Sequence, residues 1–297
     1  MRHFIDPQVV SRLSGLVLDA RIPMVGSVSG RHRSLTRGSS LEFSEYRKYV
    51  PGDDTRRLDW RAWGRSDRFY IKEFEADTNL RLCLVVDVSG SMGYGPQGQQ
   101  QNGSTKLDFA RYLCGTLAYL AAGQGDAVGL SCAGASCQLE IPPRRSAAHL
   151  KHILDKMADM KAQGDTGLPE TLHAVAEKVS QRALVVIVSD LFTDPDELRN
   201  AFQHLRFRRH DVAVFHLLEQ NELDFEFDRP IRFVDLEGAP PMLVDPTTMA
   251  RQYRDTVRSW LKEITQIVRN SLIDYHRVNI EEHYADVLAR FLLARMK

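Results

Sequence analysis

The amino-acid sequence predicts an α/β protein with a doubly wound, mostly parallel sheet and helices on both faces. Two continuous apolar runs, at residues 82–86 and 183–188, are typical of strands that are buried on both sides. From residue 80 onward, strand patterns alternate with helix patterns, and this alternation produces a parallel sheet covered by helices. The chain has 297 residues, enough for two domains. We therefore predict a smaller N-terminal segment at 1–79, packed on a main domain at 80–297.

The main domain is predicted element by element from its apolar periodicity. The strands are expected at 81–87, 127–132, 137–141, 183–188, 211–217 and 232–236. The helices are expected at 107–122, 147–160, 169–179, 249–273 and 281–296, with one more beginning after Asp194. Proline near the first turn supports two of these helix starts. The second and third strands are close enough in sequence to form a hairpin, and residues 94–104 form a low-complexity loop.

The N-terminal segment differs from the main domain in composition and periodicity. A first helix is expected at 9–18, and a Gly/Ser/Arg-rich stretch follows at 26–40. A dense polar and aromatic block occupies 42–63, and a strand with partial alternation is expected at 69–74. We expect charged side chains of the block to form a balanced ion-pair network that docks this segment on the main domain.

Composition and charge exclude several classes of function. Lys and Arg together number 39, as do Asp and Glu, so no basic field suggests a nucleic acid or an anionic membrane as partner. The apolar runs are too short to span a membrane, and the N-terminus lacks the apolar core of a signal peptide. No pair of C-x-x-C elements suggests structural zinc. We expect a cytoplasmic protein without membrane insertion.

Polar oxygen donors follow the two apolar strands. The first strand runs into D-x-S-x-S, formed by Asp87, Ser89 and Ser91, and Asp190 follows the second, while Thr166 lies in a glycine-rich turn. Each could be an ordinary capped turn on its own. Because ligands bind at the carboxyl edge of such sheets, the two carboxylates and three hydroxyls should meet there. Hard oxygen donors suit Mg²⁺, with Mn²⁺ and Ca²⁺ as alternatives.

This pattern resembles the metal-ion-dependent adhesion site of von Willebrand factor A domains, which have a Rossmann-like sheet. The resemblance covers residues 80–297 and implies that Asp87, Ser89, Ser91, Thr166 and Asp190 contact the ion directly or through water. Two departures occur. Leu191 stands after Asp190, where glycine is usual, and Asp165 stands before Thr166. Asp165 and Asp194 are therefore expected as outer carboxylates of the site.

The upstream block resembles the bacterial "domain of unknown function 58" proteins, in which such a segment precedes a von Willebrand A-like domain. The resemblance rests on the R-x-Y-x-P-G-D-D-x-R motif from Arg47 to Arg56 and on Asp59-Trp60. It implies a MoxR-type AAA+ ATPase as partner. The expected structural network of this block comprises Arg47, Asp53, Asp54, Arg56, Asp59 and Trp60.

Three classes of function compete for the same residues. A haloacid-dehalogenase-like phosphatase or phosphotransferase needs a second carboxylate in D-x-D, and the chain has Ser89 there. A serine hydrolase needs G-x-S-x-G, and Ser91 lacks its first glycine. No P-loop is present. We therefore predict a metal-dependent protein-interaction module and no enzyme, with a Mg²⁺-dependent phosphatase-like hydrolase as the alternative.

Overall fold

The chain divides into two compact units, each described separately below. One comprises Met1–Asp19 and Arg81–Lys297, and the other comprises Ala20–Leu80. The computed structural model describes residues 3–20, 42–48, 70–75, 80–95, 105–135, 139–227, 231–233, 236 and 242–296.

In the smaller unit the described residues form one antiparallel hairpin. Strand β1 (Glu42–Lys48) pairs with β2 (Tyr70–Glu75), with an irregularity in the register between Phe43 and Glu45. The strand predicted at 69–74 corresponds to β2, whereas β1 is not predicted by the sequence. The expected N-terminal network lies outside the part of the chain whose side chains are described, and it stays a prediction: Arg47, Asp53, Asp54, Arg56, Asp59 and Trp60.

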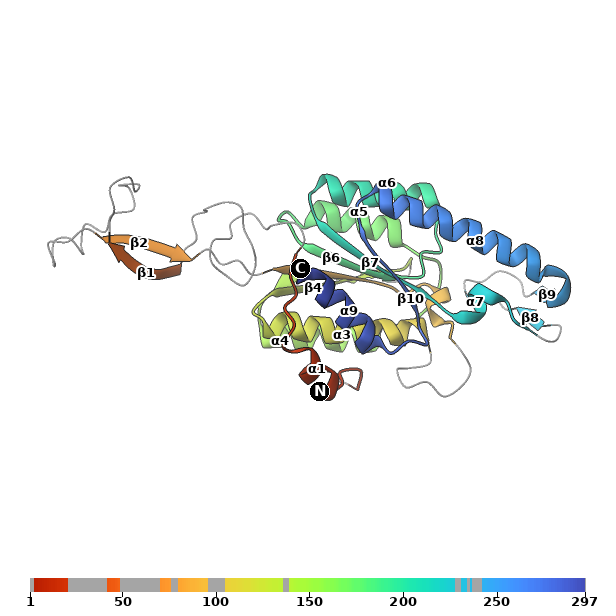
Figure 1. Ribbon diagram of the computed structural model, residues 1–297, viewed down its shortest axis with the longest axis horizontal. Helices are drawn as coiled ribbons and strands as arrows, with labels where there is room; N and C mark the ends of the chain where they lie inside the picture. Colours follow the sequence, from red (N-terminus) through yellow and green to blue (C-terminus); the bar gives the residue numbers. More distant parts are fainter. Residues whose placement is uncertain are drawn as a thin grey trace. The chain divides into compact units, whose positions relative to one another are not determined.

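A six-stranded sheet forms the centre of the larger unit (Figure 1). Its order is β10-β7-β6-β3-β4-β5, and every neighbouring pair is parallel except β4 and β5. The strands are β3 (Arg81–Asp87), β4 (Ala127–Ala133), β5 (Glu140–Arg144), β6 (Leu184–Ser189), β7 (Asp211–Leu218) and β10 (Asp274–Asn279). This arrangement confirms the predicted fold class.

Helices cover both faces of this sheet (Figure 1). One face carries α3 (Lys106–Gly123), α4 (Ala147–Asp159) and α9 (Tyr284–Arg295), with α1 (Pro7–Leu13) packed on α3. The other carries α5 (Leu168–Lys178), α6 (Pro195–Phe207) and α8 (Pro246–Asn270). None of the helices described is both long and apolar enough to cross a membrane.

Short elements connect β3 to α3 and β7 to α8. A 3-10 turn, η2 (Gly90–Gly93), follows β3, and α7 (Gln220–Asp224) follows β7. Next comes an antiparallel hairpin of β8 (Ile231–Phe233) and β9 (Met242–Val244). The prediction that 232–236 is the last strand was wrong, because the last strand of the sheet is β10. Its sequence, DYHRVN, is mostly polar, as an edge strand with one neighbour permits, so it lacks the apolar signature of the central strands.

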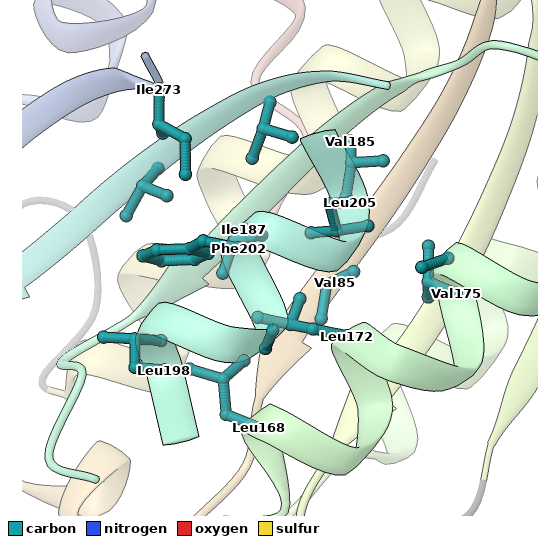
Figure 2. Packing of buried hydrophobic residues seen from close by; sticks show 14 of the residues in the cluster. Val85, Leu168, Leu172, Val175, Val185, Ile187, Leu198, Phe202, Leu205 and Ile273 are labelled. Carbon is teal, nitrogen blue, oxygen red and sulfur yellow. The ribbon is translucent and has the colours of Figure 1, made fainter. Parts of the chain in front are cut away.

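One apolar cluster fills the space between the sheet and α5, α6 and α8 (Figure 2). Val85 of β3 and Ile187 of β6 face Leu172 of α5 and Phe202 of α6, and all four are fully buried. Each such side chain contributes about 1.5–3 kcal/mol through its removal from water. The carboxyl ends of β3 and β6 are therefore anchored in a continuous core.

A buried ion-pair network ties the end of α9 to the sheet. The guanidinium of Arg295 lies 2.8 Å from Asp211 Oδ2 and 3.2 Å from Asp274 Oδ2, at the first residues of β7 and β10. It also donates to the carbonyl of Asp19 at 3.2 Å. The Arg295 side chain is fully buried. One side chain thus joins the last helix, two strands and the N-terminal stretch of the unit.

Gly115 permits the close approach of the N-terminal stretch to α3. A Cβ at Gly115 would lie 2.7 Å from the ring of Phe4, which is fully buried. Gly115→Ala should therefore lower the free energy of unfolding by about 1–3 kcal/mol through overpacking, measured by urea denaturation. Gly123→Ala is the control, because a Cβ there meets nothing within 4 Å and alanine is a better helix former. Equal stability of the two variants would contradict the close packing.

Candidate metal-binding site at the carboxyl edge of the sheet

The predicted site residues come together where the strand order of the sheet reverses. From β3 the chain moves outward to β4 and β5, and it then returns to the other side of β3 to form β6. Strands β3 and β6 are parallel neighbours, with Val86 opposite Val188. Asp87 and Asp190 therefore emerge at the same edge, at the type of crevice in which α/β proteins bind ligands.

Backbone hydrogen bonds hold the glycine-rich turn against the end of β3. Gly90 N donates to Gly164 O at 2.8 Å, and Gln163 N donates to Val88 O at 2.9 Å. These bonds place Thr166 beside the strand end, with its Oγ1 3.4 Å from Asp87 Oδ2. The convergence of Thr166 and Asp87, which are 79 positions apart, follows from this turn.

Asp87 lies at the centre of a cluster of oxygen donors. Its side chain is almost fully buried, Oδ1 accepts from Ser89 N at 2.9 Å, and Oδ2 accepts from Ser189 Oγ at 2.6 Å. The hydroxyls of Ser89 and Ser91 lie 3.1 Å apart. The structure thus brings together four of the five residues expected to bind the ion, and it adds Ser189.

The electrostatics of this cluster favour a cation. Burial and, to a smaller extent, the charge of Asp190 together raise the pKa of Asp87 to about 6, although hydrogen bonds from Ser189 and Ser89 oppose the shift. A hard divalent ion among these oxygens would offset the cost of burying the carboxylate. The described residues contain no group of three or more His, Cys, Asp or Glu side chains placed to hold a metal. An ion here would depend on the hydroxyls, and the donor set fits that requirement.

Asp190 has a partner that the sequence does not predict. Its Oδ2 lies 2.8 Å from Nζ of Lys106, and the same ammonium lies 2.5 Å from Oε1 of Glu222. Burial lowers the pKa of Lys106, but Asp190 and Glu222 outweigh it, so the net shift is upward. One sequence signal existed: Lys106 is the first residue of α3, where the helix dipole disfavours a cation.

Aromatic rings surround this ammonium. The rings of Tyr94 and Phe192 have their centroids 5.9 Å and 5.1 Å from Lys106 Nζ, within the range of cation–π attraction. Phe192 is partly exposed and stacks on Trp260 of α8 at 4.8 Å. The site therefore has an ionic interior next to an aromatic surface.

The conformation and burial of Leu191 explain how a leucine replaces the usual glycine after Asp190. Its φ is +56°, a left-handed conformation that costs a non-glycine residue about 1–2 kcal/mol. Its side chain is fully buried in the apolar cluster, and its amide donates to Ser189 Oγ at 2.8 Å. Burial of the leucine side chain offsets the strain, so the turn is retained without glycine.

The two expected outer carboxylates lie in different surroundings. Asp194 caps α6, with Oδ1 accepting from Asp196 N at 2.8 Å and from Glu197 N at 3.1 Å. Asp165 is exposed, and its carbonyl accepts from Ala135 N at 3.0 Å. A contribution of either carboxylate to the site stays a prediction.

Comparisons with known proteins give uncharacterized relatives. Uncharacterized protein Rv1480 of Mycobacterium tuberculosis (strain H37Rv) is 28% identical over 224 residues, which cover 74% of this chain and 68% of the relative. The uncharacterized protein Mb1516 of Mycobacterium bovis gives the same values.

Similar solved structures include the conserved hypothetical protein BatB from Bacteroides thetaiotaomicron, with a TM-score of 0.47 and 14% identity over 73% of this chain and 98% of that one. The SpRpn10 VWA domain gives a TM-score of 0.43 and 11% identity over 71% of this chain and 95% of that one.

The family comparison matches most of the chain. Residues 45–263 match the family described as "Protein of unknown function DUF58", and this segment includes Asp87, Thr166, Asp190 and the whole of α3. The chain therefore belongs to the DUF58 family.

Proposed function

We propose that this chain is a metal-dependent protein-interaction module. In this proposal Mg²⁺ binds among Asp87, Ser89, Ser91 and Thr166 at the sheet edge, with Asp190 contributing directly or through water. A coordination position left to solvent then accepts an acidic side chain of a partner. Carboxylate on a divalent ion gives a strong and directional contact, which suits reversible docking.

The oxygen cluster around Asp87 carries the proposal. The Asp87 carboxylate, which is 1% exposed, has four hydroxyl-bearing side chains in or next to its hydrogen-bonded shell, at the crevice of a doubly wound sheet: Ser89, Ser91, Thr166 and Ser189. Magnesium prefers such oxygens and retains waters that a partner can displace. The adhesion-site resemblance of the D-x-S-x-S, Thr and Asp pattern supports the same assignment.

The proposed partner is a MoxR-type AAA+ ATPase, for which the chain would act as an adaptor in complex assembly or maturation. Support for this step comes from the family resemblance and from the lack of a P-loop in the sequence. The energy of nucleotide hydrolysis would then come from the partner, and this chain would supply the contact to it or to its client.

A phosphatase-like hydrolase is the alternative to this proposal. It would need an acid–base carboxylate two positions after Asp87, where Ser89 stands. Asp87 itself is engaged by Ser89 N and Ser189 Oγ, as suits a ligand held in place more than an exposed nucleophile. A screen for phosphatase turnover with Mg²⁺ would support the alternative if Asp87→Ala abolished the activity.

Capture of a co-encoded MoxR-type ATPase tests the docking proposal. Wild-type chain should retain the ATPase in Mg²⁺, and EDTA or Asp87→Ala should reduce the captured amount at least about ten-fold, since the metal bridge is lost. Asp286→Ala removes an exposed carboxylate on α9 and should leave capture unchanged. Equal capture with and without EDTA would refute metal-dependent docking.

A further inference from the structure

Lys106 is a buried cation inside the proposed metal site. Its side chain is fully buried, and its ammonium contacts Asp190 at 2.8 Å and Glu222 at 2.5 Å. The side chain comes from the first residue of α3, and its backbone amide donates to Tyr94 O at 2.9 Å. Both ends of the residue are thus fixed at the same edge of the sheet.

A divalent ion and this ammonium need the same carboxylate. Asp190 is the fifth residue expected at the metal, and one of its oxygens already holds Lys106. Its other oxygen, Oδ1, has one contact to Phe192 N at 3.4 Å, a long hydrogen bond that leaves this oxygen weakly committed. Oδ1 is therefore the oxygen that can face an ion. While Oδ2 holds Lys106, the negative charge of the carboxylate is shared between the ion and the ammonium.

We propose that Lys106 is a resident counter-ion that competes with the divalent ion for Asp190 and thereby weakens the metal affinity of the site. This inference rests on the metal site of the proposed function and names the residue that regulates the metal affinity of that site. With Lys106 in place, the ammonium offsets one of the three carboxylates of Asp87, Asp190 and Glu222. Removal of its charge should therefore strengthen the binding of any added cation.

Glu222 holds Lys106 in reach of Asp190. Glu222 lies on α7, its carboxylate accepts a hydrogen bond from Glu219 N at 2.9 Å, and its carbonyl accepts from Tyr253 OH of α8 at 3.1 Å. The second partner of the ammonium is therefore anchored through two further contacts. When the divalent ion draws Asp190 away, Lys106 retains one carboxylate and does not become an unpaired buried charge.

The sign of an affinity change separates this role from a structural one. If Lys106 only supported the structure of the site, its replacement would weaken metal binding. If Lys106 is a competing counter-ion, its replacement should strengthen metal binding. Lys106→Met keeps the length and apolar stem of the side chain and removes the charge, so it is the informative substitution.

Titration with Mn²⁺ by calorimetry, at fixed pH, tests the inference. Lys106→Met should bind Mn²⁺ at least about ten-fold tighter than wild type, and Glu222→Gln should bind more weakly, because it leaves the ammonium wholly to Asp190. Lys178→Met removes an exposed lysine paired with Glu140 and should leave the affinity unchanged. If Lys106→Met is unfolded without metal, Mn²⁺ should restore a thermal unfolding transition. The midpoint of this transition should then rise more steeply with Mn²⁺ concentration than the wild-type midpoint does.

The outcomes distinguish this inference from the proposed function. Binding by wild type that Asp87→Ala abolishes, with equal or weaker binding by Lys106→Met, would overturn the counter-ion role and leave the metal site intact. Binding by Lys106→Met alone would support the counter-ion role and refute metal-dependent docking by wild type. No binding by any variant would refute both.

Discussion

Asp87→Ala should abolish measurable Mn²⁺ binding, with a loss of affinity of at least about a hundred-fold. Asp87 is the carboxylate around which the other oxygens are arranged, and its loss leaves only hydroxyls and the Asp190 carboxylate, which is already paired with Lys106. Asp87→Asn should lose binding as well, although it keeps the volume of the side chain and an acceptor for Ser89 N. Isothermal titration of the wild type and both variants measures the effect.

The control for this experiment is a carboxylate outside the site. Asp286→Ala removes an exposed acid that pairs with Arg12, and its Mn²⁺ affinity should equal that of wild type. A dissociation constant for Asp87→Ala within about two-fold of the wild-type value would show that the ion, if it binds, lies elsewhere.

Arg295→Met should lower the free energy of unfolding by about 3–5 kcal/mol. The change removes the guanidinium that faces Asp211 and Asp274, two carboxylates that are less than 10% exposed. Breaking a buried ion network by deleting one partner leaves uncompensated charge in the interior. Urea denaturation followed by circular dichroism measures the change.

Arg290→Met is the matched comparison on the same helix. Arg290 pairs with Glu282 at 2.5 Å, but its side chain is 59% exposed, so its loss should change the free energy of unfolding by less than about 1 kcal/mol. If the two variants proved equally stable, the network around Arg295 would contribute nothing beyond a surface pair.

The central strands and the meeting of Asp87 and Asp190 at one edge of the sheet could be predicted from the sequence because the signals of β3 and β6 are local. The apolar runs of β3 and β6 mark strands buried on both faces, and the geometry of a parallel sheet places Asp87 and Asp190 at one edge. Thr166 lies in a turn that the sequence indicates by its two glycines, Gly164 and Gly167. The only rule needed to bring Asp87 and Asp190 together is that the carboxyl ends of neighbouring parallel strands lie at the same edge of the sheet.

The remaining features depend on contacts between distant parts of the chain. Lys106 meets Asp190 across 84 positions and Glu222 across 116, and no sequence pattern links the three. Strand β10 is polar because it lies at the edge, so its assignment depends on pairing with β7. The positive φ of Leu191 likewise arises from the tertiary burial of its side chain, which outweighs the local preference for glycine.

The arrangement around Arg295 has a practical consequence for how fragments of this family are cut for expression. The family match ends at residue 263, within α8, and begins at residue 45. A fragment trimmed to those limits would discard β10 and α9 at one end and α1 at the other. It would expose the flank of β7 as a new edge and leave Asp211 without its guanidinium. Boundaries chosen by sequence similarity would thus yield an aggregation-prone fragment, whereas boundaries that include residues 1–19 and 264–297 keep α1, β10 and α9 with the sheet.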